Sequence, residues 1–132
     1  MKHLDIFIDG ASKGNPGPSG VGVVICHQGQ VVKNISSNIG VATNNTAEYT
    51  ALIYALEEAL ILKADSLTIN TDSQLLARQL ERVYKVRHEN IKNLYLRATR
   101  LISAFKKVAI NNIPREENSG ADKLADLGAK KK

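Results

Sequence analysis

At the start of the chain, the aliphatic residues Leu4, Ile6 and Ile8 occupy every second position, which gives a period of two. This period predicts a strand that enters a turn at Asp9-Gly10. Residues 14–20 are rich in turn formers, and two β-branched stretches follow them, Val21 to Cys26 and Val31 to Ile39. Turn residues between stretches of high β-propensity predict that the three strands form a β-meander.

Helical periodicity replaces this alternation in the next segment. Ala47 to Leu62 is predicted to form the longest helix, with Asn45 and Glu48 in the spacing of a capping box. The remaining periodicities predict strands at Ser66–Thr71 and Val108–Ile113 and helices at Ser73–Arg82, Asn90–Phe105 and Ala121–Ala129. Strands that alternate with helices after a meander predict an α/β fold, with helices on the faces of a mixed sheet, in the order βββαβααβα. Residues 1–132 contain no repeat or linker and are interpreted as one domain.

The composition is that of a soluble globular domain, with 132 residues of which 43% are apolar and 23% charged. The single cysteine, Cys26, cannot form an internal disulfide, and no Cys/His metal spacing occurs, which favours a reducing, cytoplasmic compartment. The longest apolar run, Ala51 to Leu56, is far shorter than the roughly 18 residues of a membrane span. Asp5 and Asp9 interrupt the first apolar stretch, so it is not typical of a secretory signal. We therefore expect a cytoplasmic protein without a membrane partner, and nothing in the sequence demands more than a monomer.

Charge is unevenly distributed along the chain, whose formal net charge is +5. Residues 1–70 carry 4 basic and 6 acidic side chains, whereas residues 71–132 carry 14 and 7, so the two parts have net charges of −2 and +7. A strongly basic segment is consistent with a polyanionic partner such as nucleic acid. A solvated helical face explains the same charges equally well, so charge alone does not decide the function.

Four acidic residues lie at predicted ends of elements. Asp9 closes the first strand, Glu48 opens the long helix, Asp72 closes the fourth strand and Asp122 opens the last helix. Each has a local explanation. Asp9 would be a turn residue, and Glu48 would be half of a capping box. Asp72 would be a helix cap, and Asp122 would be a first-turn acid favoured by the helix dipole. Their combination is more informative, because strand ends and helix starts of an α/β sheet meet at the edge where ligands bind. Four carboxylates at one edge would repel each other strongly unless cations neutralise them.

The donor set indicates hard divalent cations. Carboxylate oxygens without His or Cys favour Mg²⁺ or Mn²⁺ over Zn²⁺. Two such ions about 4 Å apart suit in-line displacement at phosphorus, because one activates water and the other stabilises the leaving oxygen. The polyanion indicated by the charge distribution would then be the substrate.

With these residues identified, the sequence resembles type 1 ribonuclease H over nearly its whole length. Four segments carry the resemblance, each with one of the acidic residues: Asp9 to Pro18, Thr43 to Glu48, Thr71 to Gln74, and Ala121 to Ala125. Any one of them is a weak signal, but all four in the family's order, at spacings that fit one small domain, are specific. The resemblance implies a ribonuclease H-like fold, a five-stranded mixed β-sheet flanked by α-helices.

The resemblance also implies an activity, because type 1 ribonucleases H cut the RNA strand of RNA/DNA hybrids endonucleolytically and leave 5′-phosphate and 3′-hydroxyl ends. It identifies Asp9, Glu48, Asp72 and Asp122 as the catalytic carboxylates that bind two Mg²⁺ ions, for which Mn²⁺ would substitute. Only RNA carries 2′-hydroxyls, which both donate and accept hydrogen bonds, so a site that contacts several of them identifies the strand to cut.

The same resemblance implies substrate contacts around these carboxylates. The positions that contact 2′-hydroxyls are Asn44, Asn45 and Gln74, with the backbone of Gly10, Ala11 and Ser12, and those that bind a phosphate of the DNA strand are Asn15 and Thr43. Several of them have local alternatives: Asn44 and Asn45 would also cap the helix, and Gln74 would also be an exposed first-turn residue. The glycines of residues 14–20 either serve the hairpin alone or let a nucleic-acid backbone approach.

One departure from the family pattern concerns the loop before the last carboxylate. Many members carry a histidine there, but residues 114–120 contain none. The segment resembles an archaeal-like branch of the family, in which Arg115 or Glu117 would take the auxiliary role. A solvated loop is the alternative interpretation.

A second departure concerns the grip on the substrate. Longer members insert an extra helix and a basic handle where this chain has only Val83 to Glu89. The hybrid must then be held by fewer cations, for which Lys85, Arg87 and Lys92 are candidates, or with help from a partner. We therefore expect weaker binding and a shallower salt dependence than in relatives with the handle, because fewer counterions are released.

Two other classes of function remain open. A related two-metal nuclease acting on DNA or on RNA duplexes would share the sheet and the carboxylates, although Gln74 and the Thr43-Asn44-Asn45 motif argue against an enzyme for DNA only. A non-catalytic hybrid-binding module is the other class, but binding a polyanion gains nothing from four uncompensated acids in the groove. Activity on double-stranded RNA is left open.

Overall fold

The computed structural model describes residues 1–82 and 85–131 of the chain. In chain order the elements are β1 (His3–Ser12), β2 (Gly17–His27), β3 (Gln30–Ala42), α1 (Asn44–Ile61), β4 (Ser66–Thr71), α2 (Gln74–Leu80), α3 (Glu89–Ile102), β5 (Lys107–Asn112), the 3₁₀ helix η1 (Arg115–Asn118) and α4 (Ser119–Lys130). This order confirms the predicted βββαβααβα arrangement. Val83 and Tyr84, in the short connection noted above, and Lys132 lie outside the described residues. No helix in the described part of the chain is long and apolar enough to cross a membrane.

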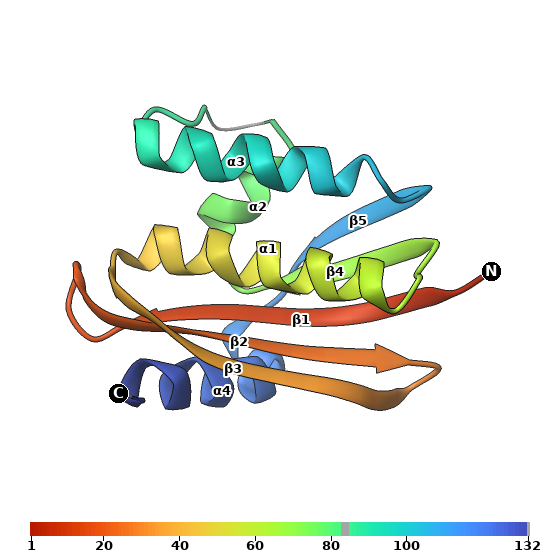
Figure 1. The fold of residues 1–132 in the computed structure, drawn as a ribbon, viewed down its shortest axis with the longest axis horizontal. Helices are drawn as coiled ribbons and strands as arrows, with labels where there is room; N and C mark the ends of the chain where they lie inside the picture. Colours follow the sequence, from red (N-terminus) through yellow and green to blue (C-terminus); the bar gives the residue numbers. More distant parts are fainter. Residues whose placement is uncertain (83–84, 132) are drawn as a thin grey trace.

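The five strands form one mixed sheet in the order β3-β2-β1-β4-β5. The three strands of the opening meander are antiparallel, whereas β4 and β5 run parallel to β1. Helix α1 packs on one face, with α3 stacked on it, and α4 packs on the other face against β1, β2 and β3 (Figure 1). The predicted α/β fold with helices on both faces of a five-stranded mixed sheet is therefore confirmed.

The core lies between the sheet and α1. Alternation along the strands sends one set of side chains toward this helix, and they are almost fully buried: Leu4, Ile6 and Ile8 of β1, Val21, Val23 and Ile25 of β2, and Leu67 and Ile69 of β4. Helix α1 contributes Leu52, Ala55 and Ala59 to this core, and Glu48 begins the same helical face. A carboxylate therefore lies at the edge of the core.

Strand β1 is longer than its sequence pattern predicts. We expected a turn at Asp9-Gly10, but β1 continues to Ser12 because Gly10 to Ser12 pair with Ser19 to Val21 of β2. The parallel partner β4 stops earlier, with Thr71 opposite Ile8. Asp9 therefore lies inside a strand, beside the point where β4 ends, rather than in a turn.

The cap of α1 also differs from the prediction. We expected Asn45 and Glu48 to form a capping box, but the helix begins at Asn44, and its N-cap residue is Thr43, whose Oγ1 accepts a hydrogen bond from the N–H of Thr46 at 3.2 Å. The predicted box was wrong because the carboxylate of Glu48 binds the backbone of β1 instead. The Glu48 side chain therefore does not cap its own helix and points toward the sheet.

Helix α4 sits close to the sheet because β2 offers glycines beneath it. A Cβ at Gly20 or Gly22 would overlap the backbone of α4. We interpreted Gly20 as part of a glycine-rich turn, but it lies within β2 and its missing side chain serves helix packing. The close approach brings the first turn of α4, which carries Asp122, onto the sheet.

The segment before α4 is solvent-exposed, as one interpretation above expected, except at Asn118, but it is helical rather than an irregular loop. Residues 115–118 form η1, and α4 begins at Ser119 instead of Ala121. Asn118, the last residue of η1, is buried at 1% exposure. Burial of a polar side chain requires hydrogen-bond partners, and those of Asn118 lie at the candidate site described next.

Candidate active site

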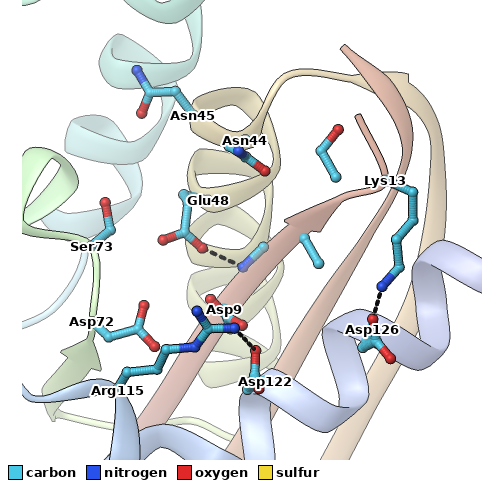
Figure 2. Close-up of a pocket in the computed structure, with 13 residues that line it drawn as sticks. Asp9, Lys13, Asn44, Asn45, Glu48, Asp72, Ser73, Arg115, Asp122 and Asp126 are labelled. Carbon is cyan, nitrogen blue, oxygen red and sulfur yellow. Dashed lines mark hydrogen bonds and ion pairs between the residues drawn. The ribbon is translucent and has the colours of Figure 1, made fainter. Parts of the chain in front are cut away.

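A cavity of about 420 Å³ opens at the edge of the sheet where β1 and β4 meet the helix starts (Figure 2). Its walls come from segments far apart in the sequence. The lining residues are Asp9, Gly10, Ala11, Ser12, Lys13, Asn44, Asn45, Glu48, Asp72, Ser73, Arg115, Asp122 and Asp126. All four predicted carboxylates are among them, so the tertiary structure brings the four sequence segments to one place.

Three of the carboxylates form a tight cluster. Asp9 comes from β1, Glu48 from the second turn of α1, and Asp72 directly follows β4. One carboxylate oxygen from each lies within 4.8 Å of the others. The pairing of Ile8 with Thr71 explains the approach of the two aspartates, because each is the next residue along its parallel strand.

Asp122 completes the group from the other face of the sheet. Alternation along β1 directs Asp9 toward the face that α4 covers, and the first turn of that helix places Asp122 beside it (Figure 2). Asp122 is partly exposed, unlike the buried Asp9 and Glu48, and Arg115 Nη2 lies 3.7 Å from its Oδ1. Among the described residues the tight cluster therefore has three members, with Asp122 at its side.

Burial makes the cluster electrostatically unfavourable as it stands. Asp9 is 6% exposed and Glu48 is 8% exposed. Loss of hydration raises the pKa of Asp9 well above its ordinary value, and the charges of Glu48 and Asp72 raise it further. Burial likewise raises the pKa of Glu48, opposed in part by the hydrogen bond from Gly10. Both carboxyls favour protonation unless a cation replaces the lost hydration.

The donor set fits a hard divalent cation. Every member of the cluster offers oxygen, three oxygens converge, and two of the carboxylates are buried with like charges against each other. Mg²⁺ and Mn²⁺ take such ligands, and their charge would reverse the repulsion. Asp9, Glu48 and Asp72 are the residues that would hold the ion, with Asp122 beside them.

The backbone of Gly10 fixes Glu48. Its N–H donates a hydrogen bond to Glu48 Oε1 (Figure 2). A Cβ at Gly10 would overlap the backbone of Ala47 and Glu48, so glycine is what allows α1 to lie this close to β1. The motif Asp9-Gly10 therefore supplies both a ligand and the contact that orients another ligand.

Asn118 is a site residue that the sequence analysis did not single out. Its Nδ2 donates to the carbonyl oxygen of Ile8 at 2.8 Å and to Oδ2 of Asp72 at 3.2 Å. The only signal in the sequence is its place in the polar segment after Pro114, four residues before Asp122. That signal does not predict which side chain it touches.

An ion pair crosses the opposite wall of the cavity, and the sequence analysis missed it as well. Lys13, in the glycine-rich connection, pairs with Asp126 of α4 (Figure 2). Asp126 also pairs with Lys130 at 3.0 Å. The hydrogen bond from Lys13 lowers the pKa of Asp126. Asp126 is thereby neutralised by lysines, unlike the four carboxylates of the predicted site.

A second hollow of about 350 Å³ adjoins the cavity. Its lining residues are Asn15, Thr43, Asn45, Thr46, His88, Asn90 and Ile91. Asn15 is held there because its Oδ1 accepts a hydrogen bond from the N–H of Asn44 at 3.0 Å. The two predicted phosphate ligands, Asn15 and Thr43, are thus brought together, next to His88 and Asn90 at the start of α3, which the sequence analysis did not identify.

The remaining predicted site residues have different placements. Gly10, Ala11, Ser12, Asn44 and Asn45 line the main cavity, and Asn45 also lines the second hollow. Gln74 is exposed at the first position of α2 and does not line the main cavity. The preceding residue, Ser73, lines it instead. Arg115 lines the cavity, whereas Glu117 lines a separate hollow with Phe7 and Val24. Of the two auxiliary candidates, only Arg115 reaches the site.

Comparison with known proteins agrees with this fold. Residues 7–128 match the reverse transcriptase-like family. The ribonuclease HI of Halobacterium salinarum is 40% identical over 125 residues, which are 94% of this chain and 63% of the relative, and its RNase H1 crystal structure superimposes with a TM-score of 0.93. The N-terminal RNase H domain of a Mycobacterium tuberculosis protein also has a TM-score of 0.93, at 37% identity, and covers 96% of this chain and 98% of that domain.

A third neighbour was solved with nucleic acid. The RNase H1 called LC11, isolated from compost, has a structure in complex with RNA/DNA hybrid. It is 36% identical to this chain, with a TM-score of 0.89 and 96% of both chains covered.

These comparisons show that this chain belongs to the reverse transcriptase-like family and, within it, to the type 1 ribonucleases H. It spans about a third of the length of the mycobacterial bifunctional protein that it matches.

Proposed function

We propose that this chain is an endoribonuclease that hydrolyses the RNA strand of RNA/DNA hybrids with two divalent metal ions, leaving 5′-phosphate and 3′-hydroxyl ends. The observation that carries the proposal is the convergence of Asp9, Glu48 and Asp72 within 4.8 Å, with Asp122 beside them. The likeness to ribonucleases HI supports it, as does a neighbour solved with a hybrid.

Metal ions held by these carboxylates, Mg²⁺ by preference and Mn²⁺ as a substitute, would supply an activated water and stabilise the charge on the leaving 3′-oxygen. Asp9 and Asp72 hold the ions most directly. Glu48 contributes a ligand oxygen and accepts a hydrogen bond from a 2′-hydroxyl of the RNA, while the Gly10 N–H keeps its carboxylate oriented. Asp122 serves the side of the site where water attacks.

Selection of the RNA strand rests on groups that line the cavity. Asn44, Asn45 and the backbone of residues 10–12 surround the carboxylates and offer both donors and acceptors to 2′-hydroxyls. Gln74 would join them only from its exposed position beside the cavity. In the adjoining hollow, Asn15, Thr43 and Asn90 bind a phosphate of the DNA strand, which places the hybrid across both hollows.

The test is cleavage of labelled RNA/DNA hybrid, double-stranded RNA, double-stranded DNA and single-stranded RNA in Mg²⁺ or in Mn²⁺, with EDTA and Asp72→Asn as controls. Cleavage of the RNA strand in the hybrid, absent in both controls, is expected, and end-labelling should detect 5′-phosphates. Cleavage of double-stranded RNA would extend the substrate range. Binding of the hybrid without any cleavage would favour a non-catalytic module, and retained activity in Asp72→Asn would remove the assigned role of that residue.

A further inference from the structure

Asn118 joins the two strand ends that carry the clustered aspartates. Its side chain is buried, and its amide nitrogen has two protons, both of which are used. One is donated to the carbonyl oxygen of Ile8 in β1 and the other to Asp72 Oδ2 beyond the end of β4. Because Ile8 immediately precedes Asp9, a single amide group connects the backbone next to one carboxylate with the other carboxylate itself.

The orientation of this amide is determined by its two acceptors. Asn118 Oδ1 is buried and has no hydrogen-bond partner among the described residues. Turning the amide over would place this oxygen against the Ile8 carbonyl and the Asp72 carboxylate, where two acceptors would repel it. The Asn118 side chain therefore leaves one polar atom unsatisfied in order to keep both of its donors in place.

Asn118 is also the only described group that donates a hydrogen bond to the Asp72 carboxylate. Asp72 follows the last residue of β4 and precedes the N-cap residue of α2, Ser73, so regular secondary structure on either side does not fix its side chain. The donor holds Oδ2 and leaves Oδ1 for another ligand. A neutral amide suits this place, because a lysine would compete with a cation and a carboxylate would add a buried charge.

We propose that Asn118 is a positioning residue of the candidate active site, which fixes the Asp72 carboxylate relative to Asp9 in the geometry that binds the catalytic cation. The inference rests on the proposed metal-dependent hydrolysis. In this proposal, η1 places one buried amide beside the ends of the paired strands β1 and β4. Ligand-orienting groups of this kind typically change metal affinity or activity by about 10- to 100-fold when they are removed.

The experiment compares Asn118→Ala and Asn118→Asp with a matched control, Asn111→Ala. Asn111 also donates its amide across the sheet, but to Asn70 Oδ1 at 3.2 Å rather than to a carboxylate of the site. Mg²⁺ binding is followed by NMR titration of the protein alone, and kcat and KM for hybrid cleavage are measured separately. Thermal unfolding reports the folded fraction of each variant.

Asn118→Ala is expected to weaken Mg²⁺ binding and lower kcat by about 10- to 100-fold, with KM for the hybrid changed less than about twofold, because the substrate contacts stay in place. Asn118→Asp should lower kcat as well, because its carboxylate repels Asp72 instead of donating to it. Asn111→Ala should leave all three quantities near wild type. Unchanged Mg²⁺ affinity in folded Asn118→Ala would overturn the proposal. An activity loss that only follows the loss of folded protein would overturn it too.

A second measurement does not depend on the folding of these variants or on cleavage. The side-chain NH₂ resonances of Asn118 in the wild-type chain should shift when Mg²⁺ is added and when Asp72 is replaced in Asp72→Asn, whereas those of Asn111 should stay in place. Resonances of Asn118 that respond to neither change would overturn the proposal. If Asn118 responds and Mg²⁺ binds but no hybrid is cut, the proposed function fails while the positioning role stands.

Discussion

The backbone N–H of Gly10 in β1 donates a hydrogen bond to the carboxylate of Glu48 in α1, where the backbones of the strand and the helix lie close together. The contact joins residues 38 positions apart and exists only because position 10 lacks a side chain. The same glycine therefore determines the distance between β1 and α1 and the direction of one predicted metal ligand. This relationship leads to the first prediction.

Gly10→Ala should destabilise the protein by about 1–3 kcal/mol, because the added Cβ overlaps the backbone of Ala47 and Glu48 and forces α1 outward. Hybrid cleavage should fall more than the folded fraction does, since Glu48 moves with the helix. Urea unfolding and cleavage assays measure both effects. Gly120→Ala is the matched control: its new Cβ meets only Val24 Cγ2, at 3.4 Å, so it should be neutral or slightly stabilising. Equal effects of the two substitutions would contradict the argument.

Asp9→Asn should abolish cleavage and yet raise the melting temperature of the metal-free protein at neutral pH. At neutral pH the Asp9 carboxyl must either take up a proton on folding or carry a charge that burial, Glu48 and Asp72 disfavour, and an amide of the same size avoids both costs. Differential scanning fluorimetry in EDTA measures the shift. Glu57→Gln, which removes an exposed ion pair with Arg97, should keep activity and change stability by less than about 1 kcal/mol. A lower melting temperature for Asp9→Asn would show that the repulsion is not what limits stability.

The metal-free protein should lose stability as pH rises through the range between the ordinary and the raised pKa of Asp9. In that range the folded carboxyl keeps a proton that the unfolded chain, with a pKa near 3.8, has released, so a rise in pH favours unfolding. Glu48 acts in the same direction. The destabilisation that Asp9 causes is absent at pH values below its ordinary pKa and is largest at pH values above its raised pKa. Melting temperatures of wild type and Asp9→Asn across pH, both in EDTA, isolate it as a difference that should grow with pH.

Adding saturating Mg²⁺ should reduce this loss, because the ion binds the ionised carboxylates of the folded state only and competes with protons. The stabilisation by Mg²⁺ should therefore increase with pH in wild type and be much smaller in Asp9→Asn. Titrations of melting temperature with Mg²⁺ at several pH values test this. Equal stabilisation of the two proteins would place the ion elsewhere.

The two auxiliary candidates of the segment before α4 should behave differently. Arg115 lines the cavity, 3.7 Å from Asp122, with a side chain that is 79% exposed, so Arg115→Ala should lower kcat by roughly tenfold, about 1.4 kcal/mol of barrier, with little loss of stability. Glu117→Ala should leave kcat unchanged because Glu117 lines another hollow. Steady-state kinetics on the hybrid decide between them. A larger effect at Glu117 would reverse the assignment.

Local pattern was sufficient for most of the fold. The strand Ser66–Thr71 was predicted with the bounds that the structure has, and the long helix, the meander and the element order also follow from periodicity and propensity. The four acidic residues could be selected together because each lies at the start or end of a predicted element. These features depend on neighbours within a few positions, and such information is present in the chain before it folds.

The contacts between segments far apart in the sequence were decided only by the tertiary structure. The extension of β1 to Ser12 depends on pairing with β2, and the placement of Asp9 beside Asp72 depends on the parallel register with β4. The donor to Glu48 is 38 residues away and the donor to Asp72 is 46 residues away, and neither follows from the pattern around the acceptor. The sequence by itself therefore determined the elements and the set of carboxylates. Register and close packing determined how those carboxylates are held, because such contacts form only when the sheet and both helix layers are assembled.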